Sequence, residues 1–291
     1  MKRKFDLTEA AIIALVLFVC LLTVYPVWYT IIYSFNEGSD SIKGPFYFLP
    51  RVFTLENYKA VFNDRTILSG FAVSFARTAI ATPLHVFFTA MVAYAFGKKE
   101  LIGRRFYVTM GLITLFVSGG LIPTFILMKN LKLLNNFMVY VWPTMFSYFD
   151  ALIFIGYFKT LPDSIEESAK IDGANDMMIF LRLVIPLSTP VIAVIMLFNG
   201  VYNWNDYFMG AIYMTTKNSL QPIQTYLYKI VATTQTNIAI ANLPPTIKVS
   251  VITPQSIRAA TMLVTTLPIV IVYPFLQKYF TKGLLLGSIK G

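Results

Sequence analysis

The chain has few of the residues on which catalytic and metal sites usually depend. Its 291 residues include one cysteine and one histidine, so a disulfide within the chain and a cluster of cysteine and histidine metal ligands are excluded. It has no H-E-x-x-H stretch and no G-x-x-x-x-G-K-[ST] phosphate loop. A Ser/His/Asp site would have to use the lone His85, which lies inside a long apolar segment. We therefore expect no metal, no cofactor, no ATP hydrolysis by this chain and no other enzymatic activity.

Charged residues are also scarce, which points to a membrane. They make up 13% of the chain, whereas soluble domains carry roughly 25%. Apolar residues make up 56% and gather in long runs. The net charge of +10 is spread over short segments between these runs, so it forms no basic face of the kind that binds nucleic acid. The composition is that of a protein that crosses a membrane several times.

Six segments are apolar enough to be membrane-spanning helices, which need roughly 20 mainly apolar residues. The first has the basic start of a signal peptide, but its apolar run continues without a small-residue cleavage site. In the third, Gly119 and Gly120 are expected to permit close helix packing. We expect an all-α membrane protein with one transmembrane domain, 1–291. Its six transmembrane helices are predicted at about residues 10–35, 70–96, 106–128, 138–158, 183–210 and 257–280.

Basic residues predict which face of the membrane each loop occupies. They flank the first span on its N-terminal side, fill the short segment 97–105 and follow the sixth span. The positive-inside rule makes these segments cytoplasmic, together with both termini and the segment between the fourth and fifth spans. Trp28, Trp142 and Trp204 would then lie near the outer interface, where tryptophan is enriched. The basic residues used are Lys2, Arg3, Lys4, Lys98, Lys99, Arg104, Arg105, Lys278, Lys282 and Lys290.

The cytoplasmic segment between the fourth and fifth spans reads LPDSIEESAKIDGANDMMIFLRLVIP and is predicted to form two short helices around a turn. Asp163 or Ser164 can cap the first helix, and Gly173 can end it in the left-handed conformation. Asn175 or Asp176 can cap the second helix. Local physics leaves two interpretations open, a solvated connector and a docking surface for another protein.

A docking role is suggested by the length and composition of this segment. A connector can be much shorter. Ala169 would let another surface approach closely, and Glu167 would offer an anion to an arginine on that surface. The same stretch also resembles the EAA loop of ABC importer permeases, with serine in place of the central alanine. The matching residues are Glu167, Ser168 and Ala169, then Asp172, Gly173 and Ala174, then Ile185 and Pro186.

Further segments are similar to the carbohydrate-uptake, maltose-type branch of these permeases. They are LIPTFILMKNLKLLNN, NWND and the ending YPFLQKYFTKGLLLGSIKG. Within that branch the chain resembles Gram-positive permeases associated with complex oligosaccharides. The resemblance implies a multi-pass permease subunit of the bacterial plasma membrane, in contact with lipid, that forms half of a translocation path for a sugar or oligosaccharide. By the same analogy, the 211–256 loop would reach into a sugar-binding protein.

The resemblance also implies partners and roles. The partners would be a second permease subunit, two ATP-binding subunits and an extracellular solute-binding protein. The cytoplasmic segment would be a coupling-helix loop that sits in a cleft of the ATPase. The ATPase-coupling residues implied are Glu166, Glu167, Ser168, Ala169, Asp172, Gly173, Ala174 and Pro186. A secondary solute transporter is the alternative, but the sequence shows no inverted repeat or paired broken helices of the kind such transporters contain.

Polar side chains inside membrane spans are costly and are therefore candidates for function. Arg77 can form a structural ion pair with Asp150 or Asp206, and His85 can be a hydrogen-bonded packing residue. Trp204 can anchor the chain at the membrane interface or stack on a sugar. The candidates for the substrate path are Tyr148, Asp150, Asn199, Tyr202, Asn203, Trp204, Asn205 and Asp206.

Overall fold

The structure is a computed structural model that describes residues 7–236 and 253–288, with side chains for residues 8–232 and 253–274. Over these residues the chain is helical, as expected, and its one β-bridge pairs Asn36 with Phe53. The basic residues Lys2, Arg3, Lys4 and Lys290 lie outside the described residues, as does most of the predicted 211–256 loop beyond residue 236.

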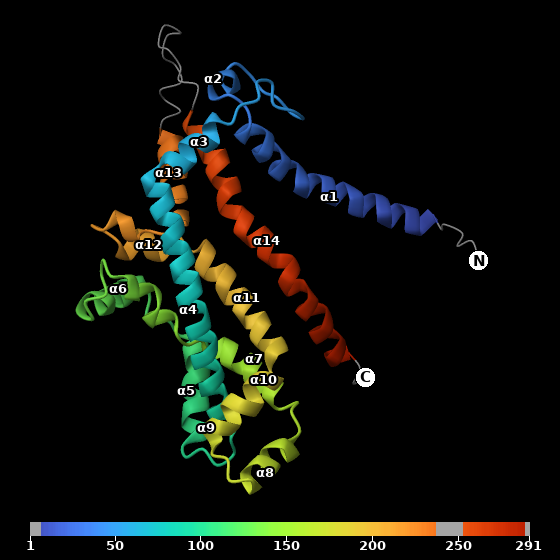
Figure 1. Cartoon of the computed structure of the whole chain (residues 1–291), viewed down its shortest axis with the longest axis vertical. Coiled ribbons are helices and arrows are strands. Elements are labelled where there is room, and N and C mark those ends of the chain that lie inside the picture. The colour runs from blue at the N-terminus through green and yellow to red at the C-terminus, as the bar shows by residue number, and fades with distance from the viewer. Residues whose placement is uncertain (1–6, 237–252, 289–291) are drawn as a thin grey trace. The chain divides into compact units, whose positions relative to one another are not determined.

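The chain combines a few long helices with many short ones (Figure 1). The α-helices are α1 (Leu7–Ser34), α2 (Gly38–Ser41), α3 (Glu56–Asn63), α4 (Arg65–Gly97), α5 (Arg104–Phe116), α6 (Leu121–Asn130), α7 (Tyr148–Phe158), α8 (Asp163–Ile171), α9 (Asp176–Ile179), α10 (Ile185–Leu187), α11 (Thr189–Asn205), α12 (Phe208–Tyr213), α13 (Ile223–Thr236) and α14 (Pro254–Ser288). The 3-10 helices are η1 (Phe137–Tyr140), η2 (Trp142–Thr144) and η4 (Asn218–Leu220). A π-helical turn, η3 (Phe180–Val184), joins α9 to α10.

Three helices are individually long and apolar enough to cross a membrane, and they match the first, second and sixth predicted spans. They are Thr8–Ser34, Arg65–Gly97 and Pro254–Pro274. Three further candidates consist of two helices joined at a bend, so the described chain has up to six spans if each bent pair counts as one. None of the most apolar window of α1 is buried within the structure, whereas 44% of the corresponding window in α4 is buried.

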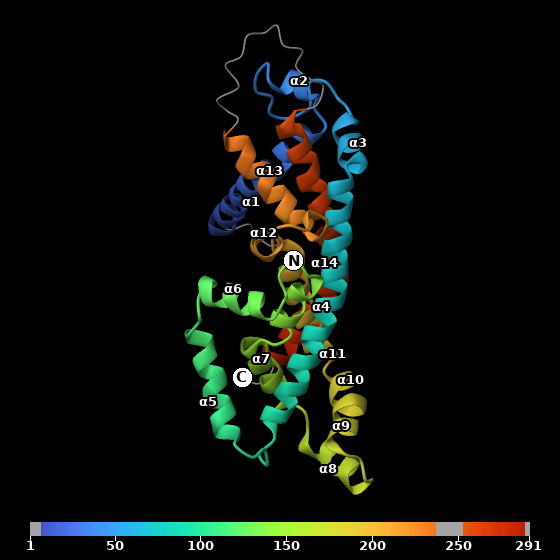
Figure 2. The same cartoon turned by 90° about the vertical axis from the view of Figure 1, so that its left-hand side faces the viewer.

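The third predicted span, 106–128, is broken rather than continuous. The chain bends by 118° between α5 and α6, and Figure 2 shows the two helices running in different directions. Val117 is extended and Gly120 has φ +79°, a left-handed conformation that glycine adopts without the Cβ clash of other residues. A Cβ added at Gly119 or Gly120 would meet nothing within 4 Å. Among the described residues these glycines therefore pack against no neighbouring helix, because they lie in the break between two helices.

The fourth and fifth predicted spans are bent as well. The chain bends by 47° between the η1–η2 segment and α7, and by 81° between the helical segment Asp176–Leu187 and α11. Pro186 lies just before the second bend and Pro190 just after it, in the first turn of α11, where the missing N–H costs no hydrogen bond. The predicted helix 183–210 ends at Asn205 instead, and α12 follows as a separate short helix.

Two compact units divide the chain, Met1–Leu68 with Leu227–Leu267, and Ser69–Tyr226 with Pro268–Gly291. In the first, Asn36 holds the turn after α1: its amide donates to Asp40 (3.1 Å) and its Oδ1 accepts from Val52 N (3.0 Å). The second unit contains two apolar cores. One joins α4, α7, η3 and α11 around Ala90, Ala93, Phe154, Phe180 and Ile195, and the other surrounds Val139, Tyr140 and Met214.

Candidate functional site

The predicted coupling loop lies at the C-terminal end of α4 and consists of α8 and α9 around a sharp turn (Figure 1). Gly173 has φ +81°, so it occupies the left-handed position predicted for it. Ala174 N donates to Ala169 O (2.9 Å) and Gly173 N to Lys170 O (3.0 Å). This pair of bonds closes the helix end and satisfies carbonyls that would otherwise lack partners.

The two helix starts differ from each other in their caps. Asn175 caps α9, as predicted, because its side chain accepts from Met178 N at 2.8 Å. The predicted cap of α8 by Asp163 or Ser164 is wrong. Pro162 occupies the cap position without a side-chain bond, and Asp163 is already helical. Its carboxylate therefore lies in the first turn, where the helix dipole favours negative charge.

The loop has an inner and an outer face. Ala169 and Ala174 are partly buried and pack against the core of α4, α7 and α11. The side chains of Glu167, Ser168 and Asp172 are exposed. Ile171 is 86% exposed at the end of α8, and sequence reasoning missed it. Its exposure could have been predicted from its position directly before Asp172 and Gly173, because a residue at such a turn tends to project from the surface.

Lys98 connects this loop to α4. It follows the last residue of α4, and its ammonium pairs with Glu166 of α8 and lies 3.6 Å from Asp176 Oδ1 of α9. The ammonium also lies 4.3 Å from the centre of the Tyr94 ring. Burial is the largest single influence on the pKa of Lys98 and lowers it, but the hydrogen bonds and charges of Glu166 and Tyr94 together raise the pKa above its ordinary value. One lysine therefore holds both helices of the loop, and Glu166 is engaged within the chain.

A polar cavity of about 290 Å³ lies between α4, the segment before α7, and α11. His85 of α4 bridges two groups there: Nδ1 lies 2.6 Å from Thr144 O, and Nε2 lies 2.8 Å from Asp150 Oδ2. Asn199 and Tyr202, about one helical turn apart on α11, also line the cavity. Phe146 and Phe198 add aromatic surface to the lining. The cavity therefore combines hydrogen-bonding groups with rings, a lining suited to polar ligands.

A buried ion pair supports this wall from behind. Arg77 is fully buried, and its Nη1 lies 2.7 Å from Asp206 Oδ2. Its guanidinium also lies 4.7 Å from the centre of the Tyr140 ring, and Nε donates to Asn203 Oδ1 at 3.2 Å. Asn203 in turn donates to Asn199 Oδ1 at 2.7 Å. Of the two ion-pair partners predicted for Arg77, Asp206 is the one that pairs with it, and Asp150 contacts His85 instead.

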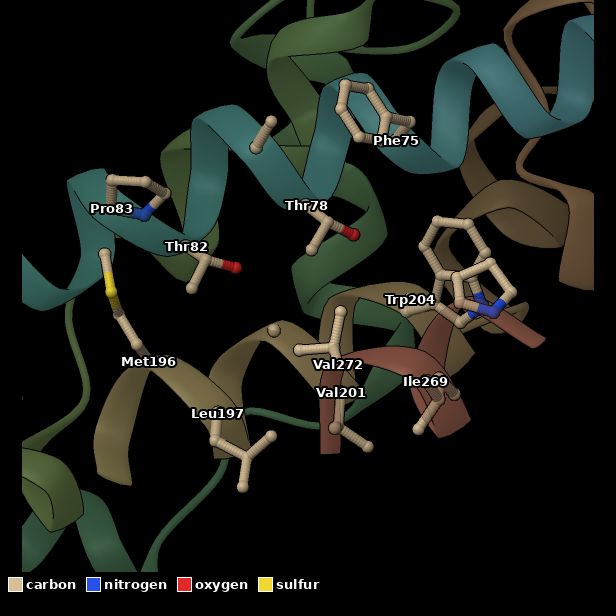
Figure 3. Close-up of a pocket in the computed structure, with 13 residues that line it drawn as sticks. Phe75, Thr78, Thr82, Pro83, Met196, Leu197, Val201, Trp204, Ile269 and Val272 are labelled. Carbon is tan, nitrogen blue, oxygen red and sulfur yellow. The ribbon is translucent and has the colours of Figure 1, made fainter. Parts of the chain in front are cut away.

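A second cavity of about 370 Å³ is apolar and uses the other face of α11 (Figure 3). The α11 residues that line this cavity are spaced so that they share one face of the helix. Phe198, Asn199 and Tyr202, which line the polar cavity, share another face. Residues of α4 and α14 complete its walls. The apolar face of α11 consists of Met196, Leu197, Gly200, Val201 and Trp204. Of the two cavities, the first is lined by more hydrogen-bonding side chains.

The predicted substrate-path residues separate into three groups. Asp150, Asn199 and Tyr202 line the polar cavity. Asn203 and Asp206 belong to the buried Arg77 network, and Asn205 accepts a bond from Gln224 at 3.4 Å. The structure does not bring the other two into the cavity. Tyr148 is buried against Gly111 and donates to Val108 O (3.1 Å), and Trp204 is 7% exposed on the apolar face near Phe71.

Known proteins resemble this chain over nearly its whole length. It is 36% identical to the polygalacturonan/rhamnogalacturonan transport system permease protein YtcP of Bacillus subtilis, covering 99% of each chain. It is 37% identical to Protein LplC of the same organism, over 93% of this chain and 90% of that one. Among solved structures, a chain of a bacterial ABC transporter involved in the import of the acidic polysaccharide alginate superposes with a TM-score of 0.84 at 25% identity. That match covers 96% of this chain and 100% of that chain.

The family match covers most of the chain and all of the elements that build the cavity and the loop. Residues 58–285 match the family described as binding-protein-dependent transport system inner membrane component. The likeness to YtcP extends the agreement to the remainder of the chain. The chain is therefore a membrane-embedded protein that belongs to the family of binding-protein-dependent transport system inner membrane components.

Proposed function

We propose that the chain is the permease subunit of an ABC importer for oligosaccharides. The main support for this proposal is the family match over residues 58–285, which includes every helix from α4 to α13 and most of α14. The structure adds a polar cavity between apolar helices and a projecting α8–α9 loop. A separate ATP-binding subunit would supply the energy of hydrolysis.

The substrate class follows from the relatives and from the cavity together. Relatives of the chain are named as permeases for polygalacturonan/rhamnogalacturonan and for arabinooligosaccharides. Hydroxyl-rich chains are recognised by hydrogen-bonding side chains flanked by aromatic rings, and the cavity offers both. We therefore propose an oligosaccharide, with Asp150, Asn199 and Tyr202 in its path.

The α8–α9 loop is proposed as the coupling element. Its exposed Glu167 and Asp172 are available to a basic cleft, and Ile171 offers an apolar contact at the projecting turn. In this proposal the loop and both termini face the cytoplasm of a bacterium. The subunits would be this chain, a second permease, two ATP-binding subunits and a solute-binding protein outside the membrane.

Co-purification with the ATP-binding subunit tests this proposal directly. A tagged chain is extracted from membranes with its partners, and ATP hydrolysis is measured with and without sugar-loaded binding protein. Glu167→Arg and Gly173→Pro, combined, are expected to abolish co-purification and stimulation. The control is Glu100→Arg, a charge reversal at an exposed position of the α4–α5 loop. Unchanged co-purification and stimulation by the double variant would refute docking through this loop.

The same preparation tests the alternative of a secondary transporter. Proteoliposomes that contain the complex are expected to take up oligosaccharide only when ATP and the binding protein are both supplied. Uptake by the purified chain alone, driven by an ion gradient without ATP, would contradict the importer and support the alternative.

A further inference from the structure

The hydrogen bonds of His85 determine how many protons the His85–Asp150 pair holds. Nδ1 lies 2.6 Å from Thr144 O, and a backbone carbonyl can only accept, so Nδ1 carries a hydrogen. Nε2 lies 2.8 Å from Asp150 Oδ2. A carboxylate and an unprotonated ring nitrogen both accept, so this second bond requires one further proton between them. Whichever atom carries that proton, the pair has a net charge of zero.

The second oxygen of Asp150 is left over. Oδ2 is used by His85, and among the described residues Oδ1 accepts no hydrogen bond. The Asp150 side chain is 20% exposed and lines the polar cavity. Asp150 therefore presents an acceptor to the cavity, and the ring of His85, only 3% exposed, fixes its orientation.

Asn199, in the lining of the same cavity, supplies the complementary donor. Arg77 Nε donates to Asn203 Oδ1 (3.2 Å), so the Asn203 amide nitrogen faces away from Arg77. That nitrogen donates to Asn199 Oδ1 at 2.7 Å, which leaves the Asn199 amide nitrogen to donate elsewhere. The buried arginine thus sets the orientation of an amide that lines the cavity.

We infer that Asp150 and Asn199 form an uncharged donor–acceptor pair that binds the hydroxyl-bearing face of a sugar ring, with His85 as the positioning residue of Asp150. This inference rests on the proposed function and specifies its substrate chemistry. Adjacent sugar hydroxyls each donate and accept, so they match one acceptor and one donor. The lining contains no lysine or arginine, so a sugar carboxylate gains no ion pair from this wall.

The test uses the whole transporter complex in detergent and two probes of equal length, galactotriose and trigalacturonate, with binding followed by saturation-transfer NMR. Asn199→Leu is expected to weaken galactotriose binding about tenfold, the equivalent of one lost hydrogen bond. Met196→Leu, on the apolar face of α11, is the matched control and is expected to change nothing. Asp150→Asn is expected to change the binding of both probes by the same factor, because it alters the hydrogen bonds of the pair but not its net charge.

Charge and structural roles are separated by two comparisons. If Asp150 carried an uncompensated charge, Asp150→Asn would selectively strengthen trigalacturonate binding, and this result would overturn the inference. His85→Leu is expected to impair assembly of the complex because it strands a carboxylate, and adding Asp150→Leu is expected to restore assembly but not galactotriose binding. A double variant that binds galactotriose like wild type would also overturn it. Wild-type complex that shows no sugar-stimulated ATP hydrolysis would instead refute the proposed function.

Discussion

Gly173 occupies a backbone conformation that other residues reach only with strain. Its φ is +81°, and a Cβ added there would meet nothing within 4 Å, so the cost of a substitution is conformational rather than steric. Gly173→Ala is expected to destabilise the turn by about 1 kcal/mol, and Gly173→Asn by less, because asparagine tolerates the left-handed region. Stimulated ATP hydrolysis by the complex measures the effect on the loop.

Gly156 provides the matched control for this prediction. It lies inside α7, and a Cβ added there also meets nothing within 4 Å, but its φ is negative. Gly156→Ala is expected to leave stimulated hydrolysis unchanged and to stabilise the helix slightly. Equal losses in the two alanine variants would contradict the conformational explanation.

Arg77 and Asp206 are the most buried ion pair among the described residues. Arg77→Met is expected to destabilise the chain by about 3 kcal/mol, because it leaves the Asp206 carboxylate buried without its cation. Asp206 also accepts from Phe208 N (3.1 Å) and Met209 N (3.3 Å) at the start of α12, so Arg77→Met with Asp206→Asn should recover part of the loss. Thermal unfolding of the purified protein in detergent gives both values. A double variant less stable than Arg77→Met would contradict this account.

Some of these contacts could be predicted from residue types and others could not. A buried arginine needs an anion, which limited the partners of Arg77 to Asp150 or Asp206. The pairing of Lys98 with Glu166 was not predicted, because Glu166 was assigned to coupling with the ATPase and Lys98 was used only to orient the chain in the membrane. Tyr148 was assigned to the sugar because it is aromatic, but Gly111 leaves space into which its ring packs.

At the scale of elements, Lys98 is the contact between α4 and the α8–α9 loop. Lys98→Met is expected to lower the sugar transported per ATP about threefold, since the ion pair joins two elements that must move together. Lys99→Met is the control, because the neighbouring side chain is exposed. Reconstituted vesicles give uptake and hydrolysis from one sample, and equal ratios in both variants would refute the role of Lys98.

The pH dependence of this contact follows from the sign of the pKa shift. The pKa of Lys98 is raised in the folded chain, so its stabilisation is complete below the ordinary lysine pKa and is lost only as pH rises through the raised value. Transport per ATP should therefore stay constant between about pH 7 and pH 9 as far as Lys98 is concerned.

The sequence predicted where the apolar helices lie, but it did not predict where three of them are bent. Apolar length identified the long helices α1, α4 and α14, because a continuous apolar run has one physical explanation. The breaks between α5 and α6 and before α11 depend on single residues, Gly120 and the Pro186–Pro190 pair, whose effect on direction is set by the packing around them. Composition alone cannot give the angle of such a bend.

At the scale of the whole molecule, many large apolar side chains of the described residues are exposed, among them much of α1 and α5. None of the most apolar window of α1 is buried, and α5 has no buried residue. Co-expression with its permease partner is expected to raise the unfolding temperature in detergent by several degrees, because a partner that binds only the folded chain stabilises it. Identical unfolding temperatures for the lone chain and the complex would contradict a shared apolar interface.

The π-helical turn η3 could allow the α8–α9 loop to rotate relative to α10 when another subunit displaces the loop. A π turn accommodates one residue more than an α turn, and Phe180–Val184 lies between the loop and the bend before α11. If that residue were absorbed into regular helix, the loop would rotate by about 100° and shift by about 1.5 Å relative to α10. Deleting Leu181, whose side chain is 45% exposed, imposes that change permanently. Distances between spin labels on the loop and on α10, compared between the deletion variant and wild type, would show whether the loop rotates and shifts relative to α10 in this way.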